Sequence, residues 1–377
     1  MAEKKFLMGN EALGRAARAA GAKAFFGYPI TPSSEIMHFW AGEASSEQGK
    51  KDGLVFLQAE DEVAAGFMVI GGVLAGMKTF TASAGPGNVL LQDGFSMAEA
   101  MRFPVVAYIM QRGGPSTSTV IYSQSEVNLT CFGGNGNGYR IVYSPSSIQD
   151  LYDYGIKVFN TAWKYRFPTF LLGDGYLAKT MSEVEIYDPA ERGIKMEPTE
   201  AYMLEKTRTR PLPSIVPSPE LEIRTADGVD YDCMRNCLNF EEETATVNRE
   251  ILEAFEKAAP EIMEWEEYGP KKAKKLIVAH GIVAAASKAA VDESVGGKSE
   301  ARLFRPITLR PFPIDALRKA AEGAEVIVVP ESALGQFARF VKDALYGHCS
   351  AKIIELSKPS MGILPEEIAA AVNAATK

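Results

Sequence analysis

The sequence predicts an α/β protein of two domains, the second smaller than the first, and three observations lead to this prediction. Short apolar segments alternate with helical segments over residues 7–185, the alternation returns over residues 275–375, and a proline-rich stretch lies between them. Strands that alternate with helices typically form a parallel sheet that helices cover on both faces. We therefore expect domains at residues 1–190 and 274–377, with a proline-rich linker and a helix at residues 191–273.

The first domain is expected to contain six strands with helices between them. Asn10 is placed to cap the first helix and Gly21 to end it, while Thr31 is placed to cap the second helix with Pro32 in its first turn. The expected strands are Ala24–Phe26, Val55–Leu57, Thr79–Ala82, Val105–Met110, Ile141–Tyr143 and Thr169–Leu172. Further helices are expected at Glu11–Ala20, Glu60–Gly76, Gln92–Met101 and Ser147–Trp163.

The rest of the chain divides into a proline-rich linker, a helix and a second domain. Pro211, Pro213, Pro217 and Pro219 interrupt a segment with neither helical nor strand periodicity, which is typical of an extended linker. A helix is expected next, over Asn248–Trp265. The second domain then alternates strands and helices, which we expect at Leu276–Ala279, Ile282–Val291, Phe304–Leu309, Ile314–Ala321, Glu325–Val329, Leu334–Leu345 and Lys352–Glu355.

Composition argues against several classes of protein. The chain has 377 residues, a formal net charge of −8 and no evident basic stripe, so we expect no nucleic-acid partner. Its longest apolar stretch, Val63–Met77, is shorter than the roughly 18 residues of a membrane span, and its N-terminus lacks a signal-peptide pattern. Four cysteines, of which only Cys233 and Cys237 are close in sequence, lack the clustering of an iron–sulfur or zinc site. We expect a cytoplasmic protein that binds no metal by itself.

Two polar segments follow the first two strands of this domain. The segment GYPITPSSE, Gly27–Glu35, delivers Thr31 to a helix start, and Glu60, Asp61 and Glu62 open an almost wholly apolar helix. Loops at the carboxyl ends of parallel strands are where open α/β sheets bind ligands. Helix capping and a solvated first turn are the plain alternatives. Because an apolar helix is expected to be buried, one carboxylate can be buried too and exchange a proton with a ligand nitrogen.

Two glycine-rich turns follow the next two strands, SAGPGN at Ser83–Asn88 and QRGGPST at Gln111–Thr117. Glycines such as Gly85 let the backbone approach a ligand closely. Arg112, at a strand end, can bind a carboxylate through two parallel hydrogen bonds. A surface arginine in a glycine loop is the alternative interpretation.

Together these segments resemble the α subunits of 2-oxoacid:ferredoxin oxidoreductases. Gly27–Glu35 looks like the family's YPITPSSE signature, Gln111–Thr117 looks like its arginine loop, and Arg305–Pro313 with Val329–Glu331 resembles its C-terminal domain. The resemblance covers residues 7–185 and 275–370. It implies a thiamine-pyrimidine-binding domain followed by a smaller α/β domain like the C-terminal domain of transketolase.

The resemblance also implies an activity. Such enzymes use thiamine diphosphate to decarboxylate a 2-oxoacid, form an acyl-coenzyme A and pass electrons through iron–sulfur clusters to ferredoxin. Their α subunit supplies a glutamate to N1′ of the aminopyrimidine, and a threonine and an arginine to the substrate, which fall here on Thr31 and Arg112. Pro29, Ile30 and Gly85 are expected at the cofactor.

Glu62 is preferred to Glu60 as the cofactor's glutamate. Other thiamine enzymes carry alanine three residues and glycine nine residues after that glutamate, and Ala65 and Gly71 stand at those positions from Glu62. Glu60 has valine at both positions, although its role at the cofactor stays open. Asp61 is expected to be a solvated first-turn acid.

The chain lacks the other half of a thiamine site. Gly173–Gly175 looks like the start of a diphosphate–magnesium motif, but no asparagine follows near residues 200–206, so we interpret Asp174 as part of a turn. Diphosphate, Mg²⁺ and [4Fe–4S] clusters are therefore expected on partners, namely a β subunit, a γ subunit and a ferredoxin-like δ subunit, with external ferredoxin as acceptor. The run Gly133–Gly138 lacks dinucleotide-binding spacing and is interpreted as a loop near the substrate or a partner.

The substrate stays open between 2-oxoglutarate and branched-chain 2-oxoacids. The arginine loop continues as STSTVIYSQ rather than the STGLPT of glutarate-type subunits. A distal carboxylate would need a second cation, for which Arg102 and Arg140 are candidates. A stand-alone thiamine decarboxylase or ligase, and a non-catalytic assembly subunit with the same fold, are the alternative functions.

Overall fold

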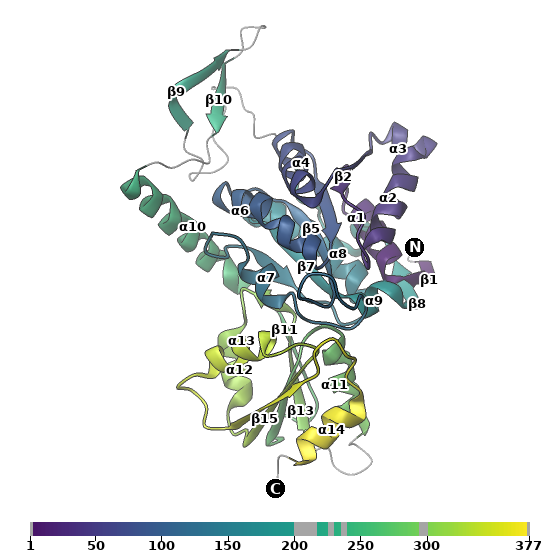
Figure 1. Ribbon diagram of the computed structural model, residues 1–377, viewed down its shortest axis with the longest axis vertical. Coiled ribbons are helices and arrows are strands. Elements are labelled where there is room, and N and C mark those ends of the chain that lie inside the picture. The colour runs from purple at the N-terminus through teal and green to yellow at the C-terminus, as the bar shows by residue number, and fades with distance from the viewer. Residues whose placement is uncertain (1–2, 200–216, 225–229, 235–239, 294–300, 375–377) are drawn as a thin grey trace.

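The protein is built of two sheets, each covered by helices, that lie end to end along the long axis of the molecule (Figure 1). The structure is a computed structural model that describes residues 3–199, 217–224, 230–234, 240–293 and 301–374. Cys237 and the prolines at 211 and 213 lie outside the described residues. Among the described residues, no helix combines the length and the apolar character needed to cross a membrane.

The larger sheet has seven strands in the order β14-β6-β7-β5-β4-β2-β3. All of its neighbours pair in parallel except β14 and β6. The six strands expected for the first domain are all present, within two residues of the predicted ends, as β2 (Ala24–Gly27), β3 (Val55–Gln58), β4 (Thr79–Ser83), β5 (Val106–Gln111), β6 (Ile141–Tyr143) and β7 (Thr169–Asp174). The parallel α/β architecture that the alternation predicts is therefore confirmed.

Helices cover both faces of this sheet because successive strand residues point to opposite sides. Phe80 of β4 meets Trp40 and Phe159 on one face, with ring centroids 5.0 and 5.9 Å apart, and Phe170 of β7 meets Phe95 on the other at 4.8 Å. The first face is covered by α1 (Gly9–Ala19), α2 (Ser34–Ser45) and α8 (Ile148–Tyr165), and the second by α4 (Glu62–Leu74) and α6 (Gln92–Ala100). Short elements complete the unit: β1 (Glu3–Met8) paired with β8 (Met181–Ile186), α3 (Glu47–Lys51), α5 (Pro86–Leu90), α7 (Val127–Phe132), α9 (Gly175–Lys179) and a 3₁₀ turn at Pro189–Arg192.

Two predicted helix caps are wrong. Helix α1 begins at Gly9, and buried Asn10 instead donates to the Pro32 carbonyl oxygen at 2.5 Å and to Glu35 Oε2 at 2.8 Å. Helix α2 begins at Ser34, three residues beyond Thr31, because residues 31–33 form a turn that Ser33 closes on the Ile30 carbonyl. Thr31 is therefore an exposed turn residue and caps no helix. Gly21, with φ 78°, does follow α1 as predicted.

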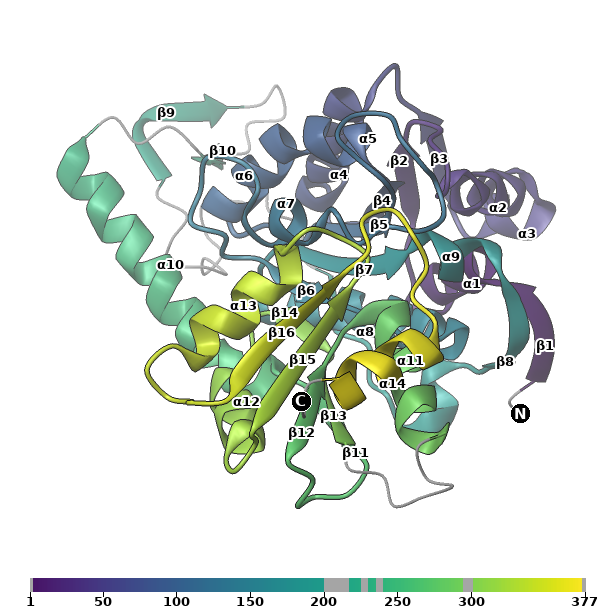
Figure 2. The ribbon, with the colours of Figure 1, turned by 60° about the horizontal axis from the view of Figure 1, so that its bottom comes forward.

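The smaller sheet has five strands in the order β11-β13-β12-β15-β16, and only β11 pairs antiparallel. Its strands are β11 (Trp265–Tyr268), β12 (Lys275–Val278), β13 (Ala301–Pro306), β15 (Val326–Glu331) and β16 (Lys352–Ser357). Helices α11 (Gly281–Glu293) and α14 (Pro365–Ala374) pack together, as do α12 (Ile314–Ala321) and α13 (Gln336–Leu345). The expected segment Phe304–Leu309 splits at Ile307, because β14 (Thr308–Arg310) leaves this sheet and joins β6 of the larger one (Figure 2).

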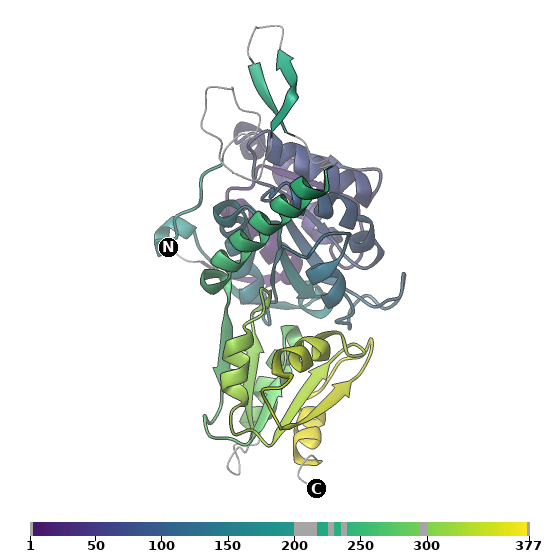
Figure 3. The ribbon, with the colours of Figure 1, turned by 90° about the vertical axis from the view of Figure 1, so that its left-hand side faces the viewer.

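The linker region contains more regular structure than its composition predicts. Pro217–Arg224 forms β9, which pairs with β10 (Asp230–Met234), although Pro217 and Pro219 fall within the strand. The following helix, α10, runs from Glu241 to Ile262 along the flank of the larger unit (Figure 3). Its buried residues recur at helical spacing, and the ring of Phe255 contacts those of Tyr139 and Phe167. Trp265, expected at the end of the helix, begins β11 instead. The domain boundaries stay a prediction.

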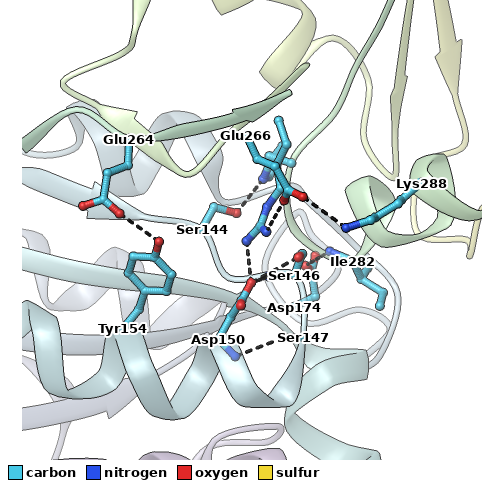
Figure 4. A network of polar contacts seen from close by, with 12 residues as sticks. Ser144, Ser146, Ser147, Asp150, Tyr154, Asp174, Glu264, Glu266, Ile282 and Lys288 are labelled. Carbon is cyan, nitrogen blue, oxygen red and sulfur yellow. Dashed lines mark hydrogen bonds and ion pairs between the residues drawn. The ribbon is translucent and has the colours of Figure 1, made fainter. Parts of the chain in front are cut away.

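Polar contacts join the two units across α8 (Figure 4). Arg305 of β13 binds Asp150 at the start of α8 and, at 3.2 Å, Glu266 of β11, which also binds Lys288. Ser144 Oγ lies 2.9 Å from His280 Nδ1, and Tyr154 donates to Glu264 at 2.8 Å. Burial, and then the Arg305 charge, lower the pKa of His280 to about 3, so the imidazole is neutral.

Asp174 ends β7 and is buried against the second unit rather than lying in a turn, as the sequence suggested. Its Oδ2 accepts from the Ile282 N–H at the start of α11 at 2.7 Å, and its Oδ1 accepts from Gln111 Nε2 at 3.2 Å. Burial raises the pKa of Asp174 to about 7, and hydrogen bonds from Ile282, Gln124 and Gln111 offset that rise in part.

The titration of Asp174 predicts a pH-dependent stability. A carboxyl group whose pKa is raised on folding binds more protons in the folded chain between its ordinary value of 3.8 and about 7, so the free energy of unfolding falls as pH rises through this range. Asp174→Asn removes this titration. Relative to that of the parent chain, the free energy of unfolding of Asp174→Asn should rise by up to about 1.4 kcal/mol for each pH unit across this range.

Urea unfolding of both chains at pH 5, 6, 7 and 8 measures this difference. Asp93→Asn, which changes an exposed carboxyl group on α6, is the control. Parallel pH profiles for the parent and Asp174→Asn would contradict the prediction.

Candidate functional site

Four loops meet at the carboxyl edge of the larger sheet, where its strand order reverses. From β2 the chain crosses to β3 on one side, and then to β4 and β5 on the other. Such a reversal leaves a crevice between the loops, which is where open α/β sheets bind ligands. Thr31 follows β2, Glu62 follows β3, Gly85 follows β4 and Arg112 follows β5.

Glu62 is the first residue of α4 and is only 5% exposed. Asp61 is its N-cap, because Oδ1 of Asp61 accepts the Ala64 N–H at 2.7 Å; this corrects the expectation of a merely solvated acid. Burial raises the pKa of Glu62, and the Asp61 charge adds to the rise, while the Glu62 backbone N–H lowers it in part. Glu60, two residues earlier, is exposed.

Gly87 lets the side chains of Glu62 and Ser83 pack closely against its backbone. A Cβ atom added at Gly87 would lie 2.3 Å from Glu62 Oε1 and 2.2 Å from Ser83 Oγ, so both side chains face the same point. The Ser83 hydroxyl is buried and has no hydrogen-bond partner among the described residues. A buried carboxyl group beside a buried hydroxyl that lacks a partner is suited to binding a polar group from outside the chain.

Arg112 and Thr31 are in direct contact. Arg112 is only 6% exposed, and its Nη1 donates to the Thr31 carbonyl oxygen at 2.9 Å, while Nη2 lies 3.4 Å from the Ser118 carbonyl. Its Nε has no partner among the described residues. The structure thus brings together two of the predicted residues, with guanidinium N–H groups left to bind an anion.

Gly85 lies in the turn that contacts both Arg112 and Glu62. Its φ of 54° lies in the left-handed region, and an added Cβ would lie 2.9 Å from Arg112 Cδ. Glycine is therefore required both by backbone conformation and by the arginine packed against it. In the turn Ser83–Gly87, Gly87 lies against Glu62 and Gly85 lies against Arg112.

Sequence reasoning missed Glu126. Its carboxyl group is 4% exposed and accepts the backbone N–H groups of Gly85 and Arg112, both at 2.8 Å. Burial raises its pKa, and hydrogen bonds from Arg112, Asn88 and Gly85 together with the Arg112 charge offset that rise in part. An acid at the start of the short helix α7, as Glu62 is at the start of α4, was the available signal.

Pro29 and Ile30 directly precede Thr31, and their place at a cofactor stays a prediction, while Arg102, Arg140 and the Gly133–Gly138 loop make other contacts. Pro29 is exposed, and the Ile30 carbonyl accepts from Ser33. Arg140 is fully buried and binds Glu99 at 3.2 Å, while Arg102 donates to the Tyr165 carbonyl and lies over the Phe167 ring. The Gly133–Gly138 loop contacts Arg310 of β14 and, through Asn137, α10.

Two family models match consecutive parts of the chain. A family model described as "Pyruvate flavodoxin/ferredoxin oxidoreductase, thiamine diP-bdg" matches residues 15–264, and one described as "Pyruvate:ferredoxin oxidoreductase core domain II" matches residues 273–366. The ketoisovalerate oxidoreductase subunit VorB of Methanothermobacter marburgensis is 32% identical over 90% of this chain and 89% of its own length. The 2-oxoglutarate synthase subunit KorA of Methanocaldococcus jannaschii is 33% identical over 88% and 89%.

Solved structures share the fold. The 2-oxoglutarate:ferredoxin oxidoreductase from Magnetococcus marinus with 2-oxoglutarate, coenzyme A and succinyl-CoA bound matches with a TM-score of 0.83 at 23% identity, over 99% of this chain and 65% of that one. A split-gene transketolase matches with a TM-score of 0.56 at 13% identity. Because the first family model covers more than half of the chain and both relatives exceed 30% identity over most of it, the chain belongs to the 2-oxoacid:ferredoxin oxidoreductase family, as an oxidoreductase subunit with a thiamine diphosphate-binding domain.

Proposed function

We propose that this chain is the α subunit that binds the aminopyrimidine half of thiamine diphosphate and the 2-oxoacid, in a complex that converts the acid and coenzyme A to acyl-CoA and CO₂ and reduces ferredoxin. The observation that carries the proposal is the cluster at the carboxyl edge of the larger sheet, where buried Glu62 faces the Ser83 hydroxyl and Arg112 contacts Thr31. VorB and KorA, named above, support this role by similarity.

Glu62, Ser83 and Gly87 fit an aminopyrimidine ring. Gly87 lets the Glu62 carboxyl group and the Ser83 hydroxyl approach the same point with no side chain between them, and the free hydroxyl offers a hydrogen bond beside the carboxyl group. Thiamine diphosphate, when bound, supplies the electron sink that decarboxylation of a 2-oxoacid requires. Glu62, whose pKa is raised by burial, would hold a proton at the ring nitrogen N1′ when the cofactor is bound. Glu60 is exposed, which supports Glu62 as the carboxyl group in this role.

Arg112 is proposed to bind the carboxylate of the 2-oxoacid. Main-chain carbonyls of Thr31 and Ser118 hold two corners of its guanidinium group, and the remaining N–H groups stay available for a charged acceptor. Thr31 fixes the arginine through its carbonyl, and its exposed side chain completes the substrate contact. Arg102 and Arg140, the other candidate cations, are engaged elsewhere. On this chain's residues, a branched-chain 2-oxoacid therefore fits better than 2-oxoglutarate.

A partner is proposed to cover the crevice. Exposed apolar side chains lie on the elements that carry Glu62 and Gly87 or stand beside them, namely Val55 and Leu57 on β3, Phe67 on α4, and Val89 and Leu90 on α5. Exposed apolar groups of this kind mark protein interfaces. We propose that a β subunit docks here and brings the diphosphate and Mg²⁺, with γ and ferredoxin-like δ subunits and their [4Fe–4S] clusters completing the electron path. A cytoplasmic location stays a prediction.

Two alternative functions are weighed by particular residues. A stand-alone decarboxylase or ligase needs its own diphosphate–magnesium motif. Asp174, the aspartate with which that motif would begin, instead accepts hydrogen bonds from Ile282 and Gln111. A non-catalytic assembly subunit would have no use for a buried Glu62 beside a free Ser83 hydroxyl. Both observations support the proposed role.

Activity of the natively purified complex tests the proposal. With coenzyme A present, it should reduce ferredoxin or a viologen dye in the presence of 2-oxoisovalerate, 2-oxoglutarate, pyruvate or an aryl 2-oxoacid. Turnover with one acid identifies the substrate. No turnover with any of them, in a complex shown to hold thiamine diphosphate and intact clusters, would refute the proposal, and turnover by this chain alone would favour the stand-alone enzyme.

Glu62→Gln should lower kcat by about 10²–10⁴-fold, the range for removal of an acid–base group, while the complex still assembles. The amide keeps the shape of the side chain but cannot exchange the proton. Glu60→Gln, which alters an exposed carboxyl group two residues away, is the matched control and should retain parental turnover. Equal rates for Glu62→Gln and the parent complex would remove Glu62 from the mechanism.

Arg112→Ala should raise KM for the 2-oxoacid about 10- to 100-fold, as expected from losing a hydrogen bond of about 1.5–3 kcal/mol to a charged group. Steady-state kinetics with varied 2-oxoacid and saturating coenzyme A measure the change. Arg166→Ala, at the C-cap of α8, is the control. An unaltered KM in Arg112→Ala would rule out the substrate role.

A further inference from the structure

A buried carboxyl group that the proposed mechanism does not use lies directly behind the arginine loop. Oε1 of Glu126 accepts the N–H groups of Arg112 and Gly85, both at 2.8 Å, and Oε2 accepts Asn88 Nδ2 at 2.9 Å. Arg112 follows β5, while Gly85 and Asn88 follow β4. One carboxyl group therefore joins the ends of two neighbouring strands at the crevice.

A chain of buried hydrogen bonds determines which group of Asn88 faces Glu126. Asn88 Oδ1 accepts from Gln92 Nε2 at 2.9 Å, and Gln92 Oε1 accepts from Arg140 Nη1 at 2.8 Å. Arg140 in turn is held by Glu99, so this chain of buried side chains fixes the Asn88 amide with its NH₂ group toward Glu126. Glu126 thus faces three N–H donors. A side chain can bind all three only if both of its terminal atoms are acceptors, as they are in a carboxylate.

We infer that Glu126 is a positioning residue, which holds the Arg112 backbone against Gly85 and so aims the guanidinium group at the carboxylate of the 2-oxoacid; this inference rests on the proposed function of the crevice. Glu126 acts through backbone contacts, since it binds the Arg112 N–H while the Arg112 side chain reaches forward to Thr31. The Arg112 side chain packs across Gly85. A shift of the backbone N–H of either Arg112 or Gly85 therefore moves the guanidinium group. Arg112 and Glu126 therefore act as one unit.

Glu126→Gln is the informative change because it keeps the size of the side chain. Glutamine has one acceptor oxygen and one NH₂ group, so one of the three donors must face another donor. In the complete complex, KM for the 2-oxoacid should rise about tenfold, as expected from loss of one hydrogen bond to a charged group, while kcat stays within about threefold.

A double-mutant cycle separates positioning from general structural damage. If Glu126 acts through Arg112, then Glu126→Gln should change KM by less than about twofold in an Arg112→Ala background, because coupled residues are non-additive. The same tenfold change in both backgrounds, or a lower kcat with unchanged KM, would overturn the inference. Glu331→Gln is the matched control, since Glu331 is also fully buried and also accepts a backbone N–H, that of Phe337, but in the smaller unit.

Amide hydrogen exchange of the full complex supplies a readout that needs no turnover. Glu126→Gln should speed exchange in peptides covering residues 84–88 and 112–118, and Glu331→Gln should leave those peptides unchanged. Unchanged exchange in Glu126→Gln would overturn the anchoring role. A parent complex that turns over no 2-oxoacid would instead refute the proposed function, and the exchange result would still report whether Glu126 holds the two loops.

Discussion

Parallel pairing of β2 with both β3 and β4 is the constraint on which the rest of the site depends. Parallel strands end at the same edge of a sheet, so the turns after β2, β3, β4 and β5 must share one rim. Glycines at that rim leave room for neighbouring side chains to approach the backbone closely. Gly85 and Gly87 admit Arg112 and Glu62 where any side chain would collide. Polar groups can then be buried together because backbone N–H groups and carbonyls, rather than water, satisfy them.

Buried carboxyl groups serve two different purposes in this fold. Glu126 and Asp174 each accept backbone N–H groups from segments far apart in sequence, Gly85 with Arg112 in one case and Ile282 in the other. Each joins elements that hydrophobic packing alone would leave free to slide. Glu62 differs, because its carboxyl oxygen Oε1 packs against Gly87 beside the unpartnered Ser83 hydroxyl. Burial raises the pKa of Glu62, and a carboxyl group with such a shift is commonly retained where it has a chemical task.

Sequence periodicity predicted the six strands of the larger unit because each is a short apolar segment between turn residues. Local rules failed where distant residues compete. Thr31 fits a helix cap, yet Asn10 of α1 binds Pro32 and Glu35, and the helix starts at Ser34. The crossing of β14 into the larger sheet, and the pairing of β9 with β10, depend on contacts that no local pattern encodes. Glu126 was missed because its partners follow other strands, at Gly85 and Asn88.

The site on this chain is chemically one-sided. Under the proposed function it offers an acid for a ring nitrogen and a cation for a carboxylate, whereas Asp174, which could have begun a metal site, instead accepts the Ile282 N–H at the start of α11. A cofactor bound through its ring alone would be held weakly and left open to water. Exposed Leu57 and Phe67, on β3 and α4 beside the crevice, lose their contact with water only if another surface covers them. Under the proposed function, the partner subunit that covers them would also exclude water from the loops that carry Glu62 and Arg112.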